Sequence, residues 1–148
     1  MTTTRWLRIS AVLSFLFAVG HTLGGRKSWS PMGDNPVLRA MKSTPFDLKG
    51  TERTYLDFYL GFGYSISVFQ VTLAVLLWQL ATLADSNPRA ARPMIAVIAL
   101  ATALCGAISY RLILPLPALF SAVTFASLAI AYVKGMNPDP DALRQSPQ

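Results

Sequence analysis

The sequence is poor in the residues that bind metals and form disulfides, with one cysteine and one histidine among 148 residues. A lone cysteine, Cys105, cannot form an intramolecular disulfide, and the usual nitrogen and sulfur metal sites need several such ligands. The chain also lacks a P-loop and the glycine motif of dinucleotide-binding folds. We therefore expect neither a metal nor a cofactor.

Charged residues are scarce as well, at 14% of the chain, whereas hydrophobic residues make up 53%. Soluble domains carry about 25% charged residues, so this composition excludes an ordinary soluble protein. The net charge of +6 comes from lysines and arginines scattered over the expected loops and termini. No single basic face is formed, so we expect no nucleic-acid partner and favour contact with anionic lipid headgroups.

What the sequence has in excess is long apolar stretches. A bilayer core about 30 Å thick is crossed by about 20 apolar residues in a helix. Four stretches approach or exceed that length, and we predict an all-α fold in which residues 1–148 form a single domain, a multi-pass four-helix bundle in the cell membrane. The predicted spans are approximately residues 6–25, 52–84, 93–114 and 117–134.

From Gly24 to Gly50 the composition changes to glycine, proline and charge, and residues 26–51 form the longest connection. Within it, Asn35 followed by Pro36 is typical of a helix start, and apolar and basic residues then alternate at helical spacing. We predict a short interfacial helix at Pro36–Ser43 and expect Thr51 to cap the second span. The three prolines of residues 135–148 predict a disordered tail.

Polar side chains are expected to gather at one membrane face, because neighbouring spans run in opposite directions. Ionisable groups at membrane depth are costly unless they face the protein interior or water. At about 100° per residue, Ser14 shares a face of the first span with His21, and the second span carries a similar polar stripe. The expected members at this face include His21, Asp57, Tyr64, Tyr110 and Arg111.

These stripes predict a shared polar pocket in which the His21 imidazole donates a hydrogen bond to the Asp57 carboxylate. That bond fixes the imidazole tautomer and leaves the second imidazole nitrogen free for proton transfer. We assign His21, Asp57 and Tyr64 as candidate catalytic residues. The candidate ligand-binding residues are Tyr59, Ser14, Gly61, Ser65, Tyr110 and Arg111. If the protein is an enzyme, this set suits an isomerase, a cyclase or an epoxide-opening enzyme.

Each part of this pocket has a structural alternative. Small residues such as Ser14, Gly61 and Ser65 are the ordinary means of close helix packing in lipid. His21 could donate to a backbone carbonyl, and Arg111 could extend to the headgroups. The same groups also suit binding of a quinone or a sterol-like headgroup without chemistry.

Two segments carry a resemblance to known proteins. Gly20–Gly25, which reads GHTLGG, and Asp57–Gly63, which reads DFYLGFG, resemble a group of small uncharacterised bacterial four-helix membrane proteins that are broadly DoxX-like in layout. The resemblance covers the first half of the chain by motif and the second half by hydropathy. It implies the four-helix architecture and a bacterial inner membrane, and it assigns no chemical role to any residue.

The sequence thus leads to two hypotheses. The first is a membrane protein that binds, and in its enzymatic version transforms by acid–base chemistry, a small lipophilic molecule in an intramembrane polar pocket. The second is a non-catalytic accessory subunit that packs against a larger membrane partner. Membrane lipids are expected partners in both, and assembly with a second copy of the chain is left open.

Overall fold

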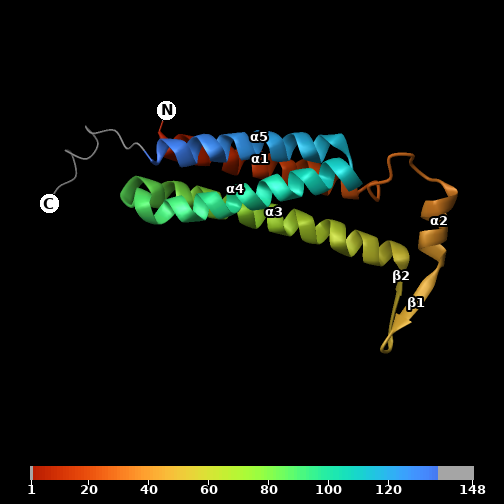
Figure 1. The fold of residues 1–148 in the computed structure, drawn as a ribbon. Helices are drawn as coiled ribbons and strands as arrows, with labels where there is room; N and C mark the ends of the chain where they lie inside the picture. Colours follow the sequence, from red (N-terminus) through yellow and green to blue (C-terminus); the bar gives the residue numbers. More distant parts are fainter. Residues whose placement is uncertain (1, 137–148) are drawn as a thin grey trace. The chain divides into compact units, whose positions relative to one another are not determined.

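The computed structural model describes residues 2–136, which form five helices and one two-stranded antiparallel sheet (Figure 1). The all-α fold predicted from hydropathy is confirmed, with the small sheet as an addition. Of the predicted tail, only Gly135 and Met136 are described, and they form a turn. The remainder of that prediction lies outside the described residues.

Four of the helices are long and apolar enough to cross a membrane. They are α1 (Thr3–Gly25), α3 (Tyr55–Ser86), α4 (Pro88–Leu112) and α5 (Pro115–Lys134). Even α5, the shortest, has 20 residues, which corresponds to about 30 Å at 1.5 Å per residue. The chain is therefore an integral membrane protein with several spans.

The described chain divides into two compact units. The bundle unit comprises the residues up to Phe15 and those from Thr72 onward, and the loop unit comprises Leu16–Val71. Parts of all four long helices meet in the bundle unit, where small and branched apolar side chains form one core. That core consists of Leu7, Ala11, Leu77, Leu80, Ala81, Ala84, Ala91, Ile95, Ala99, Leu128 and Ala131.

Small polar residues allow close helix approach in the bundle unit. Ser10 of α1 donates to Ser127 of α5 over 3.0 Å, and Ser127 donates to the backbone oxygen of Trp6 over 2.9 Å. A Cβ built on Gly106 of α4 would lie 3.0 Å from the Cβ of Ser121 in α5. These contacts are those expected for helices that associate in lipid by packing and short hydrogen bonds.

Helix α4 begins five residues earlier than the predicted start at residue 93. The side chain of Asn87 accepts a hydrogen bond from the backbone N–H of Ala90 over 3.1 Å, and Pro88 occupies the first turn. This cap starts the helix before Pro93, which lies inside it. A proline there costs one backbone hydrogen bond but does not prevent the helix from forming.

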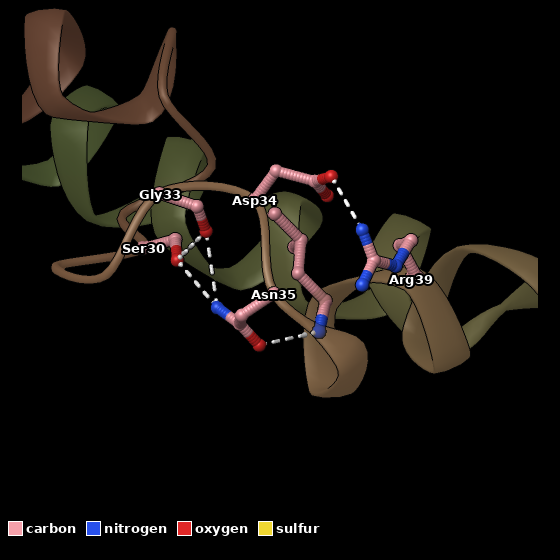
Figure 2. Close-up of polar contacts among 6 residues, drawn as sticks. Ser30, Gly33, Asp34, Asn35 and Arg39 are labelled. Atoms are coloured by element: carbon pink, nitrogen blue, oxygen red, sulfur yellow. Dashed lines mark hydrogen bonds and ion pairs between the residues drawn. The ribbon is translucent and has the colours of Figure 1, made fainter.

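Helix α2 of the loop unit spans Pro36–Ser43, as predicted. The side chain of Asn35 accepts from the backbone N–H of Leu38 over 3.1 Å, and its amide donates to the backbone oxygen of Gly33 and to Ser30 (Figure 2). One side chain therefore caps the helix and fixes the turn before it. Its position at a membrane interface remains a prediction.

Strands β1 (Pro45–Leu48) and β2 (Thr51–Thr54) form a hairpin that the sequence analysis did not anticipate. Lys49 and Gly50 connect them with φ values of 54° and 82°, as a tight hairpin turn requires. Because Thr51 pairs with Leu48 in this sheet, it does not cap the second span. The helix begins at Tyr55 instead.

Candidate functional site

The chain reverses direction at the end of α1, and the reversal points the side chain of Trp29 back onto that helix. Backbone N–H groups of Lys27 and Ser28 donate to the oxygens of Gly24 and Gly25 over 3.0 and 2.9 Å. Ser28 and Trp29 then adopt left-handed φ values of 52° and 45°. The indole Nε1 donates to the backbone oxygen of His21 over 2.9 Å, which closes the reversal.

The Trp29 indole lies against three glycines of the loop unit. A Cβ on Gly63 of α3 would be 2.2 Å from indole atoms Cη2 and Cζ3, and one on Gly25 of α1 would be 2.7 Å from Cζ2. A Cβ on Gly24 would be 3.1 Å from Cδ1. The absence of side chains at these positions creates a flat slot, which we call the glycine slot (Gly24, Gly25 and Gly63).

Aromatic rings surround the indole. The His21 ring centroid lies 4.9 Å from that of Trp29, and the rings of Tyr64 and Tyr59 meet the indole edge-on at 5.1 and 6.0 Å. Phe17 stacks on His21 at 5.7 Å. Contacts of this kind are favourable beyond the apolar area they bury. We call His21, Trp29, Tyr59 and Tyr64 the aromatic cluster.

His21 has a buried nitrogen without a partner. Its Nε2 atom is enclosed and makes no hydrogen bond to any residue of the described chain. The backbone oxygen of the same residue is occupied by Trp29. An unpaired polar atom in a buried position is rare in native structures.

The predicted hydrogen bond between His21 and Asp57 is not formed. The Asp57 carboxylate accepts from the backbone N–H and the hydroxyl of Thr54 over 2.9 and 2.8 Å. In return, the backbone N–H of Asp57 donates to the Thr54 hydroxyl over 3.1 Å. These reciprocal bonds are a capping box at the start of α3, and they explain why the exposed carboxylate does not orient the imidazole.

The other predicted site residues of the loop unit are all exposed, and only the two tyrosines among them contact Trp29. Tyr64 and Tyr59 contact Trp29. Ser65 donates to the backbone oxygen of Gly61 over 2.9 Å within its own helix, and both residues are exposed. Apart from its chain neighbours and its own helix backbone, no described residue has an atom within 4 Å of a Cβ built on Gly61, so the close approach in α3 is made at Gly63 instead.

The remaining predicted site residues belong to the bundle unit. Ser14 is buried, with 3% of its surface exposed, whereas Tyr110 is 80% exposed. Arg111 is also exposed. The structure therefore brings three predicted site residues of the loop unit, His21, Tyr59 and Tyr64, into contact with one shared residue, Trp29.

Trp29 is the principal residue that the sequence analysis missed. It lies in residues 26–51, a polar stretch whose composition predicts only a connection. A tryptophan four residues after a Gly-Gly pair, together with a further glycine at position 63, was the available signal. Bulky residues seldom adopt positive φ, which made the reversal difficult to foresee.

A second candidate site is a wide depression of about 490 Å³ on the connection between α1 and α2. Its lining includes Lys27, Asp34 and Lys42. Asp34 pairs with Arg39 over 2.9 Å at an exposed position, where ion pairs contribute little (Figure 2). The depression has no buried polar group like the His21 nitrogen, so we favour the aromatic cluster.

No family model, curated protein or solved structure matches this chain. The DoxX-like layout therefore remains a prediction, and function is inferred from the geometry of the aromatic cluster.

Proposed function

We propose that this integral membrane protein binds a small lipophilic molecule at the aromatic cluster of the loop unit, within a bacterial inner membrane. The observation that carries the proposal is the buried Nε2 atom of His21, which has no partner among residues 2–136. Leaving such an atom unpaired costs about 1–3 kcal/mol. A ligand with one oxygen atom beside the imidazole would offset that cost.

The surroundings of the imidazole support an apolar ligand. Phe17, Tyr59 and Tyr64 supply aromatic surfaces, and the adjacent helix segments are strongly apolar. Sites for small molecules typically combine apolar and aromatic walls with a few polar groups. The His21 Nε2 atom is the polar group that the described residues leave unpaired at this site.

Binding without conversion is the version that the geometry favours. Acid–base catalysis by the predicted pair requires the Asp57 carboxylate to accept from His21, and that carboxylate is bound by Thr54. An imidazole without this orienting partner can still donate to a ligand oxygen or accept from a ligand hydroxyl.

Copurification tests the proposal. The protein would be purified in detergent as wild type, His21→Phe and Thr22→Val, and bound small molecules would be extracted and identified by mass spectrometry. His21→Phe keeps a flat ring but removes both nitrogens, whereas Thr22→Val changes a neighbouring residue whose hydroxyl bonds to its own helix. The Trp29 bond is kept in both variants because its acceptor is a backbone oxygen.

We expect one compound at close to one equivalent in the wild type and in Thr22→Val, and its depletion in His21→Phe. Equal amounts in all three proteins, or no compound above the detergent background, would contradict the proposal. A stoichiometric protein partner captured from native membranes, with no bound compound, would favour the accessory-subunit hypothesis.

A further inference from the structure

We infer that the glycine slot is the binding site of a flat aromatic ring bearing a hydroxyl group, such as a hydroquinone on an apolar chain, and that this ligand binds by displacing Trp29. The inference rests on the proposed function and names its ligand class. It depends on the shape of the slot, on the hydrogen bond made by the indole and on the backbone that holds Trp29 there.

The shape of the slot selects a flat group. Indole atoms lie 2.2–3.1 Å from the Cβ positions that Gly24, Gly25 and Gly63 lack, so any occupant must fit against bare backbone on two helices. Branched or puckered groups are thicker than an aromatic ring and would meet that backbone. The edges of Tyr59 and Tyr64 already face an aromatic ring, and the same contacts suit a ligand ring.

The hydrogen bond that the indole makes requires the ligand to carry a hydrogen-bond donor. Nε1–H of Trp29 donates to the backbone oxygen of His21 over 2.9 Å, so displacement frees a carbonyl that needs a new N–H or O–H. A ring hydroxyl supplies one, whereas a ring with only carbonyl or ether oxygens does not. A second ring oxygen could then pair with the nearby His21 Nε2, which has no partner within the described part of the chain.

The backbone favours release of the tryptophan. Ser28 and Trp29 both have φ values in the left-handed region, which disfavours residues with a side chain. A ligand that replaces the indole allows both residues to return to ordinary backbone conformations. In the protein without a ligand, Trp29 thus fills the glycine slot, and a ligand must compete with the indole for this space.

Competition predicts that removing the indole strengthens binding. If Trp29 fills the slot for more than about 90% of the time, Trp29→Ala raises the affinity of a slot ligand by at least about tenfold. The probe is 2-naphthol, a two-ring compound with one hydroxyl, and binding is measured by equilibrium dialysis of protein nanodiscs against empty nanodiscs. Gly20→Ala is the control, because no side chain of the described residues beyond its chain neighbours lies within 4 Å of the added Cβ.

We expect Trp29→Ala to bind 2-naphthol at least about tenfold more tightly than the wild type and the Gly20→Ala protein. We also expect it to bind 2-methoxynaphthalene, which lacks the donor, at least tenfold more weakly than 2-naphthol. Adding Gly63→Ala to Trp29→Ala should abolish the gain. Equal or weaker 2-naphthol binding in Trp29→Ala, or equal binding of the two probes, would overturn the inference.

A second measurement applies if Trp29→Ala does not fold. In a Trp6→Phe and Trp78→Phe background labelled with 5-fluorotryptophan, Trp29 gives the only fluorine signal. Saturating 2-naphthol should move that signal to the position of an exposed tryptophan, and an unchanged signal at saturation would overturn the inference. If the signal is unchanged but a copurified compound still depends on His21, the proposed function stands and only the displacement of Trp29 is wrong. If no such compound is found, both proposals are wrong.

Discussion

Trp29 fills the space that a side chain at position 63 would need, since a Cβ on Gly63 would lie 2.2 Å from two atoms of the indole. This contact joins the reversal after α1 to the first half of α3 within the loop unit. The same indole packs against the His21 ring, and the centroids of the two rings lie 4.9 Å apart. A glycine at position 63 is therefore a condition for the whole aromatic cluster.

The first prediction concerns this contact. Gly63→Ala should destabilise the protein by about 1–3 kcal/mol, because the added methyl overlaps the indole and one of them must move. Gly61→Ala lies on the same helix, where no side chain within residues 2–136, other than those of its chain neighbours, comes within 4 Å of the added Cβ. It should be neutral or slightly stabilising, because alanine favours the helix. Thermal unfolding followed by circular dichroism in detergent measures both, and equal melting temperatures would show that Trp29 is not packed there.

The second prediction concerns the start of α3. Thr54→Ala should destabilise the protein by about 1 kcal/mol, because it removes the hydroxyl that caps the first turn. Thr51→Ala is the matched control, since Thr51 lies at the other end of β2 and makes no cap. Hydrogen exchange of the amides of the first turn of α3 measures the effect. Faster exchange in Thr51→Ala than in Thr54→Ala would be incompatible with the capping box.

The spans and α2 could be predicted because each depends on a local rule. Hydropathy is sufficient to identify a long apolar helix, and Asn35 followed by Pro36 marks a helix start from sequence alone. The capping box was also readable, since Thr54 has an acidic residue three positions later and Thr51 does not.

The aromatic cluster could not be predicted because it depends on non-local geometry. Helical periodicity places His21 and Asp57 on polar stripes but fixes neither the rotation of one helix against another nor the local partner of a carboxylate. Thr54 is three residues from Asp57 and donates two hydrogen bonds to its carboxylate. The position of Trp29 required two residues with positive φ, which no sequence pattern here signals.

The third prediction concerns the hairpin turn. Lys49 has a φ of 54° beside Gly50 at 82°, and asparagine tolerates this conformation better than lysine. Lys49→Asn should therefore stabilise the hairpin, and Lys49→Val should destabilise it by about 1 kcal/mol, because β-branched residues resist positive φ. Deuterium uptake by residues 45–54 measures both. Slower uptake in Lys49→Val than in the wild type would contradict the turn geometry.

The last prediction concerns the contact between α1 and α5 in the bundle unit. Ser127 is 3% exposed and bonds to both Ser10 and the Trp6 backbone, so Ser127→Leu should destabilise the bundle by about 1–3 kcal/mol through overpacking. Ala126→Leu, at the neighbouring exposed position, adds similar bulk toward lipid and should change little. Chemical unfolding in mixed micelles compares them. Equal stability of the two variants would mean that these helices do not approach closely at Ser127. Where the two serine hydroxyls lie 3.0 Å apart, there is no room for a leucine side chain.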